Sequence, residues 1–281
     1  MNLTSKIFSY IKITRPLNVV ITFFVVVVAI LISQTEKTSF YILLLSSIAA
    51  SLVAAAGNII NDIFDIETDK ISHQNRVLVL GEITKKQAWY LYIILNITSI
   101  LLALSLSSIL FVIVFFTILL LFFYSAYLKQ QPLVGNLIIA SITGLTFIYG
   151  GYASGNPLAA IVPAVFAFLI NFIREIVKDI QDIEGDLKLN YKTFPIRFGI
   201  DKSKQLIVLI TLILIGFSVY PYLTKLYHIE YFIIMMVFVN PLLIICLKYL
   251  FDSIKANGIA NASNLLKLNM VLGLIAIYFG K

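Results

Sequence analysis

Long apolar stretches recur throughout this 281-residue chain, and they limit its possible folds more than any other feature. Hydrophobic residues make up 60% of the sequence and charged residues 12%, and the mean hydropathy is +0.98. A soluble domain normally carries about 25% charged residues, because it must cover its surface with polar groups. The composition therefore predicts an integral membrane protein.

A membrane-spanning helix needs about 20 mostly apolar residues. Nine stretches of the chain meet this requirement, so we expect an all-α, polytopic protein with about nine transmembrane helices around a central cavity, formed by a single domain over residues 1–281. The predicted spans are 17–33, 40–61, 88–105, 108–127, 133–151, 158–176, 205–222, 229–250 and 262–279. The shortest break, between Ser105 and Ser108, is uncharged.

The 21 Lys and Arg residues predict the orientation of these spans. With the N-terminus in the cytoplasm, all of them fall on the cytoplasmic side except Lys37, Lys225 and Lys281. Cytoplasmic loops are generally enriched in positive charge. We therefore expect a multi-pass protein of the cell membrane whose N-terminus and active-site mouth face the cytoplasm. No cleavage site for a signal peptide follows the basic N-terminal segment, so none is expected.

The remaining composition narrows the ligand classes. Cys246 is the one cysteine, and His73 and His228 lie far apart in the sequence, so disulfides and a Cys or His metal site are not expected. The net charge of +7 lies in loops beside apolar spans. It therefore indicates contact with membrane lipids and anionic substrates rather than with nucleic acid, and no protein partner is inferred.

Nine of the 14 acidic residues occur in two short windows, 62–69 and 175–186, both on the predicted cytoplasmic side. The first window lies in NIINDIFDIETD, residues 58–69. On a helix, Asn61, Asp65 and Asp69 share one face with Asn58 and Asp62 at its edge, whereas Glu67 points away. Acidic residues at the ends of spans are costly and usually functional.

The second window lies in REIVKDIQDIEGD, residues 174–186. Asp179, Asp182 and Asp186 share a face that Lys178 flanks, whereas Glu184 points away. Carboxylates crowded on one face repel one another unless a cation is present. Oxygen ligands alone suit Mg²⁺, which typically takes one or two carboxylates together with substrate phosphates. Two such faces predict a magnesium-dependent clamp for a diphosphate.

The pair NDxxDxxxD and DxxDxxxD resembles the UbiA superfamily of intramembrane prenyltransferases. The resemblance extends over nearly the whole chain through KITRPLN near the start, YSAYLK after the fourth span and GNLIIASITGLTFIYGG in the fifth. Within the superfamily, REIVKDIQDIEGD followed by KTFPIRFG is similar to the digeranylgeranylglyceryl phosphate synthase branch. The resemblance implies transfer of a geranylgeranyl group from geranylgeranyl diphosphate to the free hydroxyl of a lipid acceptor, geranylgeranylglyceryl phosphate, in ether-lipid biosynthesis.

The resemblance also implies roles for particular residues. The expected metal ligands, which are catalytic, are Asp65, Asp69, Asp182 and Asp186, and Lys129 is a further catalytic residue. The expected substrate-binding residues are Arg15, Asn61, Asp62, Arg76, Tyr124, Asn171, Arg174, Lys178 and Asp179. Tyr124, Tyr127 and Tyr149 are candidates for stabilising an allylic cation, with helix packing or an interfacial belt as the alternative. The alternative role of Arg15 is to anchor the chain at the membrane surface.

One loop departs from the pattern of that branch. Where its members read NRPxRPxPxG, this chain reads SHQNRVLVLG: Arg76 is retained, His73 replaces the earlier arginine and the prolines are missing. Details of diphosphate binding by this loop are therefore open.

Three other functions are alternatives to this geranylgeranyl transfer. A prenyltransferase for an aromatic acceptor of quinone or haem synthesis would use the same metal site. A CDP-dependent phosphatidyltransferase requires a D-G-x-x-A-R run, which this sequence lacks. A membrane cation transporter would normally place its acids near the bilayer midplane rather than at span ends.

Overall fold

Nine helices are long and apolar enough to cross a membrane in the part of the chain that the computed structural model describes, residues 3–251 and 258–281. These spans are Pro16–Ser33, Phe40–Phe64, Lys85–Leu106, Ser108–Ala126, Val134–Ala153, Pro157–Gln181, Ile200–Leu223, Ile229–Phe251 and Gly258–Gly280. Each coincides with one predicted span, and the described residues contain helices but no strands. The all-α membrane fold is therefore confirmed, while the central cavity remains a prediction.

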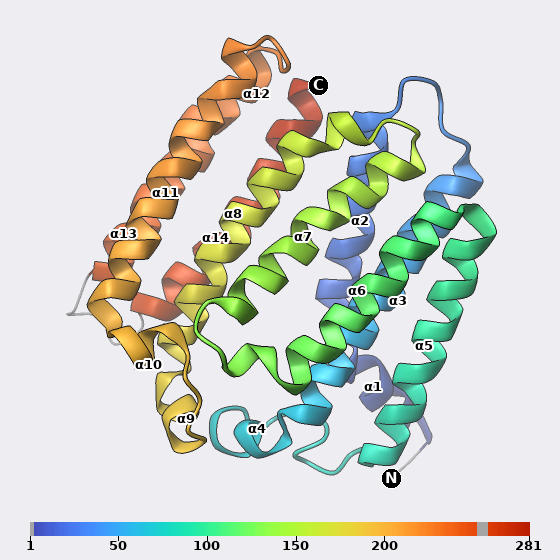
Figure 1. The fold of residues 1–281 in the computed structure, drawn as a ribbon, viewed down its shortest axis with the longest axis vertical. Coiled ribbons are helices and arrows are strands. Elements are labelled where there is room, and N and C mark those ends of the chain that lie inside the picture. The colour runs from blue at the N-terminus through green and yellow to red at the C-terminus, as the bar shows by residue number, and fades with distance from the viewer. Residues whose placement is uncertain (1–2, 252–257) are drawn as a thin grey trace. The chain divides into compact units, whose positions relative to one another are not determined.

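The chain divides into two compact units, residues 1–129 with 146–158 and residues 130–145 with 159–281. The first unit contains α1 (Leu3–Ile13), α2 (Pro16–Ser33), α3 (Phe40–Phe64), α4 (Ile66–Ser72), α5 (Lys85–Leu106), α6 (Ser108–Ala126) and the second half of α7 (Val134–Ala153). Helix α3 packs against α2, α5 and α6, so it is the central helix of this unit (Figure 1).

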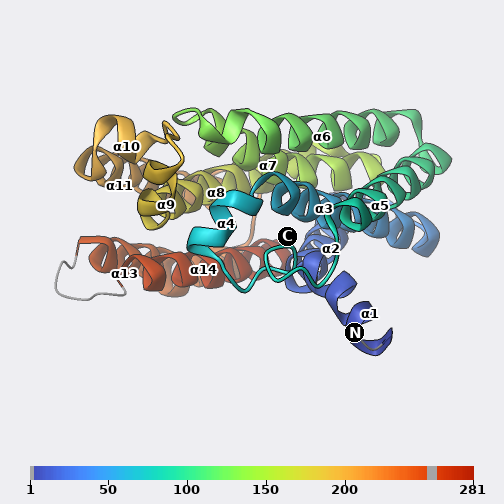
Figure 2. The same cartoon turned by 90° about the horizontal axis from the view of Figure 1, so that it is seen from below.

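The second unit begins with the first half of α7 and ends with α14. Its other helices are α8 (Ile161–Gln181), α9 (Ile183–Lys188), α10 (Phe194–Phe198), α11 (Ile200–Leu223), α12 (Ile229–Ile234), a π-helix (Met235–Val239), α13 (Asn240–Phe251) and α14 (Gly258–Gly280). Helix α8 packs against α11 and α14. Figure 2 shows the short helices α4 and α9, each following a long helix of its own unit.

Hydroxyl side chains define where several spans begin. The Ser107 hydroxyl accepts a hydrogen bond from the backbone N–H of Leu110 at 3.2 Å, which starts α6 directly after the predicted break. Thr84 and Gln87 form a capping box at the start of α5. Such caps satisfy N–H groups that have no partner within the helix, so uncharged residues are sufficient to separate α5 from α6.

Glycines allow close helix packing in both units. A Cβ atom at Gly144 would lie 2.8 Å from the carbonyl oxygen of Ala164, so α7 and α8 approach closely in the second unit. A Cβ atom at Gly150 would overlap the side chain of Ala29, which brings α7 onto α2 in the first unit. Small residues at such contacts are typical of membrane helices.

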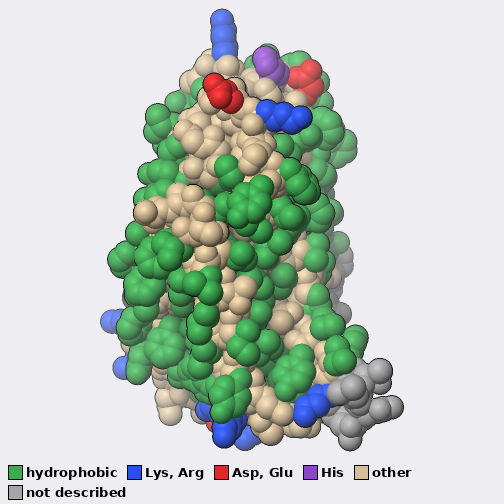
Figure 3. Space-filling view, turned by 90° about the vertical axis from the view of Figure 1, so that its right-hand side faces the viewer, with side chains coloured by type: hydrophobic (Ala, Val, Ile, Leu, Met, Phe, Trp, Pro, Cys, Tyr) green, Lys and Arg blue, Asp and Glu red, His purple; other side chains and the backbone are tan. Residues whose placement is uncertain are grey.

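Apolar side chains also cover the outside of the helices. Figure 3 shows one face on which hydrophobic side chains extend along the spans, while charged side chains gather near the span ends. Phe24, Ile97 and Phe116 are among the many large apolar residues exposed in mid-span. This distribution is the reverse of that on a soluble protein and matches a hydrocarbon environment.

Candidate functional site

Both acidic motifs lie where a long helix breaks at the middle aspartate. Helix α3 ends at Asp65, with φ −92° and ψ 6°, and α8 ends at Asp182, with φ −96° and ψ 5°. A short helix follows each break, and the backbone N–H of Asp69 bonds to Asp65 as that of Asp186 does to Asp182. The helix on which the spacing of each motif was judged is therefore interrupted at its middle aspartate, and the two interruptions have nearly the same geometry.

Asp65 takes no part in capping the short helix that it precedes. Its carboxylate accepts a hydrogen bond from Asn61 Nδ2 at 2.8 Å and forms an ion pair with Lys129. An Asp, Ser or Thr side chain that precedes a helix normally accepts a hydrogen bond from an N–H group of the first turn. The Asp65 carboxylate makes no such bond, because it already interacts with Asn61 and Lys129. The helix break therefore leaves the Asp65 side chain directed to other side chains rather than to the backbone.

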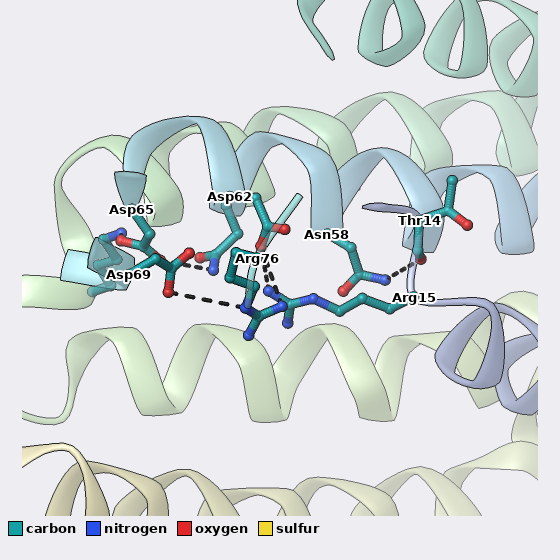
Figure 4. A network of polar contacts seen from close by, with 9 residues as sticks. Thr14, Arg15, Asn58, Asp62, Asp65, Asp69 and Arg76 are labelled. Atoms are coloured by element: carbon teal, nitrogen blue, oxygen red, sulfur yellow. Dashed lines mark hydrogen bonds and ion pairs between the residues drawn. The ribbon is translucent and has the colours of Figure 1, made fainter. Parts of the chain in front are cut away.

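Asp62 and Asp69 share arginine partners in the first unit. Asp62 is 2% exposed and forms an ion pair with Arg15, and Arg76 Nη1 lies 3.6 Å from its Oδ1 atom. Arg76 Nε lies 4.0 Å from Asp69 Oδ1, so one guanidinium connects the two carboxylates. Figure 4 shows this network and the two arginines that approach it from different segments. Buried carboxylates require such partners.

A turn between α1 and α2 holds Arg15 in place. Arg15 has a positive φ of 53°, and the carboxamide of Asn58 donates to the carbonyl oxygen of Thr14 at 2.9 Å. Pro16 then begins α2, a position at which its missing N–H is harmless. This turn, which is visible in Figure 4, directs Arg15 toward α3. The structure therefore gives Arg15 a specific carboxylate partner in addition to its predicted location near the membrane surface.

Burial raises the pKa of the Asp69 carboxyl above its usual value, because removal from water penalises the charged form. The neighbouring Asp62 adds to this effect, whereas Arg76 opposes it. A cation bound beside Asp69 would favour its ionised form. The electrostatics of the first motif are therefore those of a site that gains from an additional positive charge.

The loop after α4 is fixed by apolar burial although it lacks the expected prolines. Val77 is 2% exposed and packs with Ile13, Ile59 and Ile83 in the core of the first unit. Glu82 accepts a hydrogen bond from Ser9 at 2.7 Å. Arg76 precedes Val77, so this anchor holds the guanidinium beside the acidic motif. His73 is exposed, and sequence reasoning did not identify the role of Val77.

The second motif has a neutral partner on another helix. Asn136, in α7, donates from Nδ2 to Oδ2 of Asp179 at 2.8 Å and is itself 6% exposed. Sequence reasoning missed Asn136, although it lies in the GNLIIAS run that carries the family resemblance. The close packing of α7 on α8 at Gly144 brings the two side chains within reach.

Glu175 pairs with both cations of the same helix. Its carboxylate lies 2.8 Å from Arg174 Nη1 and 3.2 Å from Lys178 Nζ. Asn171, one turn earlier, is buried and donates to the carbonyl oxygen of Ala167 at 3.2 Å. The predicted residues of α8 therefore lie together, but the role of Asn171 in substrate binding remains a prediction.

Glu67 and Glu184 point away from the aspartate faces of the two motifs, as predicted. Glu67 is exposed and pairs with Lys70 at 2.7 Å, and Glu184 is exposed as well. Asp69 and Asp186, in contrast, are buried. The difference between the two faces therefore persists despite the helix breaks.

The three tyrosines have different surroundings. Tyr149 is buried in an apolar cluster with Val26, Ile30 and Leu110, an environment that favours the packing alternative. Tyr127 is largely exposed beside the end of α6, which favours the interfacial alternative. Tyr124 is half-buried one turn before Lys129 and remains a candidate for substrate binding.

The donor atoms suit a hard cation that is completed by a ligand. Among the residues that the structure describes, no three Asp, Glu, His or Cys side chains converge closely enough to hold a metal ion by themselves. Each motif instead offers carboxylates and neighbouring carboxamides. Mg²⁺ commonly binds through one or two carboxylates, waters and substrate phosphates, so these residues fit it.

Comparison with known proteins agrees with this arrangement. Residues 21–271 match the model of the UbiA prenyltransferase family. A digeranylgeranylglyceryl phosphate synthase of Sulfurisphaera tokodaii is 41% identical over 173 residues, which cover 60% of this chain; the chain spans 62% of the length of that relative.

Solved structures give the same fold. The structure of a digeranylgeranylglyceryl phosphate synthase superposes with a TM-score of 0.80 at 30% identity and covers 98% of both chains. A UbiA homolog from Archaeoglobus fulgidus, solved bound to GPP and Mg²⁺, has a TM-score of 0.65 at 21% identity and covers 96% of this chain and 99% of its own. The family match, supported by these folds, shows that this chain belongs to the UbiA prenyltransferase family.

Proposed function

We propose that this protein transfers a geranylgeranyl group from geranylgeranyl diphosphate to the free hydroxyl of geranylgeranylglyceryl phosphate, with Mg²⁺ as cofactor. Relatives at 41% and 33% identity carry the name of that synthase, and the second of them aligns over 81% of this chain. The observation that carries the proposal is the first motif, where carboxylates suited to a metal lie among cations suited to a phosphate. A site of this composition serves a metal–diphosphate complex.

The reaction breaks the bond between the allylic carbon and the diphosphate oxygen, and the electron pair leaves with the diphosphate. The acceptor oxygen then forms a bond to that carbon and loses its proton. Bound Mg²⁺ would supply charge neutralisation of the leaving diphosphate, held by Asp65, Asp69, Asp182 and Asp186. We assign both motifs to this one reaction because their backbone geometries match.

Arg76 and Lys129 contribute fixed positive charge to the leaving group. In the absence of ligand, their side chains pair with Asp62, Asp65 and Asp69. Substrate phosphates would exchange for these carboxylates, which become available to the metal. Preorganised cations stabilise charge that develops as a bond breaks, and this is commonly the largest electrostatic contribution to catalysis.

The polar contacts around Asp65 and Asp179 orient the motifs. Asn61 and Asn136 donate hydrogen bonds to Asp65 and Asp179, which fixes the direction of each carboxylate. Tyr124 lies close enough in sequence to Lys129 to line the same region. The apolar spans exclude water, which would otherwise capture an allylic cation.

Arg174 and Lys178 are assigned to the acceptor phosphate. That phosphate remains attached to the acceptor throughout the reaction, so it needs static cations rather than a metal. We also propose that the motifs face the cytoplasm, since Lys and Arg residues are concentrated at those span ends.

A defined assay tests the proposal. Purified protein receives labelled geranylgeranyl diphosphate, Mg²⁺ and either geranylgeranylglyceryl phosphate or an aromatic precursor of quinones, and products are identified by mass. We expect prenylation of the glyceryl phosphate, loss of activity with EDTA and recovery with excess Mg²⁺. Prenylation of the aromatic acceptor alone would establish the other activity. Ion flux through liposomes without a diphosphate would instead indicate a transporter.

A further inference from the structure

Lys267 is an exposed charged residue in the half of the last apolar span that begins on the predicted cytoplasmic side. It lies nine residues after the first residue of α14, Gly258, which corresponds to about 13 Å at the usual helical rise of about 1.5 Å per residue. Arg174 lies seven residues before the last residue of α8, Gln181, or about 10 Å by the same rise. Both helices are predicted spans, where a charge is costly and generally functional.

Three cations lie on two helices, α8 and α14, that pack against each other within the second unit. The two helices pack against each other, and Figure 1 shows them side by side and running in opposite directions. Because the two helices run in opposite directions, Arg174, about 10 Å before the end of α8, and Lys267, about 13 Å after the start of α14, lie at a similar depth on them. The family motifs did not identify Lys267 as a site residue, because it lies more than 80 residues after the second motif.

The group formed by Arg174, Lys178 and Lys267 has more positive charge than its carboxylate partners can balance. Arg174 and Lys178 both pair with the single carboxylate of Glu175, at 2.8 Å and 3.2 Å. Within the residues that the structure describes, no carboxylate forms an ion pair with Lys267. Asp179, the other acid influenced by Lys178, is hydrogen-bonded to Asn136 and belongs to the metal-binding face. Like charges repel one another, so this surplus of positive charge is suited to an anion.

We propose that Lys267 is a substrate-binding residue that, together with Arg174 and Lys178, holds the phosphomonoester of the acceptor. This inference rests on the proposed function, because that function supplies an acceptor with a permanent phosphate. The diphosphate is the weaker candidate for this group, since α14 contributes no aspartate for a metal. A phospholipid headgroup has the same chemistry, but headgroups lie at the ends of spans, whereas Lys267 lies about two turns inside one.

The test compares Lys267→Gln with the intact enzyme in nanodiscs of neutral lipid and, in parallel, of anionic lipid, using geranylgeranylglyceryl phosphate and the same acceptor without its phosphate. We expect the KM for the phosphorylated acceptor to rise about tenfold, the loss associated with one charged hydrogen bond. The kcat and the KM for the donor should remain unchanged. With the unphosphorylated acceptor, the variant and the intact enzyme should be alike, because Lys267 has no phosphate to bind.

Lys248→Gln is the matched control, since Lys248 is an exposed cation of α13 outside the group, and its kinetics should equal those of the intact enzyme. Lys267→Arg should retain most of the affinity because it keeps the charge. If Lys267→Gln does not fold, Lys267→Met offers a second neutral side chain that is compatible with lipid.

Three outcomes would overturn the inference. An unchanged KM for the phosphorylated acceptor removes Lys267 from the site, and an equal rise for both acceptors assigns it a structural role. An effect that appears only in nanodiscs of anionic lipid assigns the cations to a headgroup. If the intact enzyme does not prenylate the phosphorylated acceptor at all, the proposed function fails, a result that is distinct from the other three.

Discussion

Asn136 donates a 2.8 Å hydrogen bond to Asp179 from a different helix, and this bond fixes the first carboxylate of the second acidic motif. The corresponding acid of the first motif, Asp62, is instead paired with Arg15 and Arg76. The two motifs thus share a backbone geometry but differ in how their first carboxylate is held. A neutral donor fixes orientation without compensating charge, so Asp179 remains more dependent on a metal than Asp62.

Asn136→Ala should therefore weaken the response to magnesium. Asp179 shares a face with the proposed metal ligands Asp182 and Asp186, and groups that orient the carboxylates around a metal typically contribute about 10–100-fold to metal affinity or activity. We expect the Mg²⁺ concentration for half-maximal activity to rise by about tenfold or more, as measured by titrating the metal at saturating donor. Asn136→Asp should raise this Mg²⁺ concentration further, because it places a second negative charge beside Asp179.

Asn96→Ala provides the control for that experiment. Asn96 is a similarly buried carboxamide in α5, away from both motifs in the sequence. Its removal should lower the melting temperature without changing the magnesium titration. If both variants shift the magnesium response equally, Asn136 contributes to stability alone.

The acidic residues should separate into two groups by mutation. Asp65→Ala, Asp69→Ala, Asp182→Ala and Asp186→Ala should each reduce kcat by orders of magnitude, because each is expected to hold the metal. Glu67→Ala and Glu184→Ala should have small effects, since both side chains are exposed on the opposite face. Turnover at saturating Mg²⁺ is the measurement. Comparable damage in all six variants would contradict the assignment of faces.

Two glycine substitutions test the packing of the first unit: one at a tight helix contact, and a control at a position with open space around it. Gly150→Ala should destabilise the protein by about 1–3 kcal/mol, because the new methyl group would overlap Ala29. Gly216→Ala should be neutral or slightly stabilising, since no heavy atom lies within 4 Å of the added methyl group. Thermal unfolding in detergent measures both. Equal melting temperatures would show that α2 and α7 are not packed in this way.

Much of the fold follows directly from the sequence because a hydrocarbon environment imposes simple rules. Length and apolarity identified all nine spans, including the break that the Ser107 cap confirms. The ends of the spans were less predictable. Helix α8 continues to Gln181, beyond the expected end at residue 176, because polar residues extend a helix after it leaves the apolar region.

The site was predictable in composition but not in its cross-helix partners. The spacing of the acids separated Asp69 from Glu67 correctly, even though the helix breaks between Asp65 and the residues that follow. Asn136 and Val77 could not be found in this way. Their roles depend on which helix packs against which, and a single sequence contains no direct record of such contacts.

The last prediction separates Arg15 and Arg174, two arginines that were both expected to bind substrate. Arg15 forms the closer of the two ion pairs of buried Asp62, so Arg15→Ala would leave that carboxylate with Arg76 alone, at 3.6 Å. Loss of one partner from a buried pair is typically costly, by about 3–5 kcal/mol. We therefore expect Arg15→Ala to lower stability and kcat. Arg174 is half-buried, and Glu175 retains Lys178 when Arg174 is removed, so Arg174→Ala should leave stability nearly unchanged.

Arg174→Ala should instead raise the KM for the phosphorylated acceptor more than it lowers kcat. The acceptor phosphate keeps the same charge in the ground state and the transition state, and loss of such uniform binding appears in KM. Steady-state kinetics with the donor held at saturation distinguish the two variants, and their melting temperatures provide the stability comparison. The same kinetic change in both variants would mean that Arg15 and Arg174 act on one substrate group. A normal acceptor KM for Arg174→Ala would exclude Arg174 from the phosphate site.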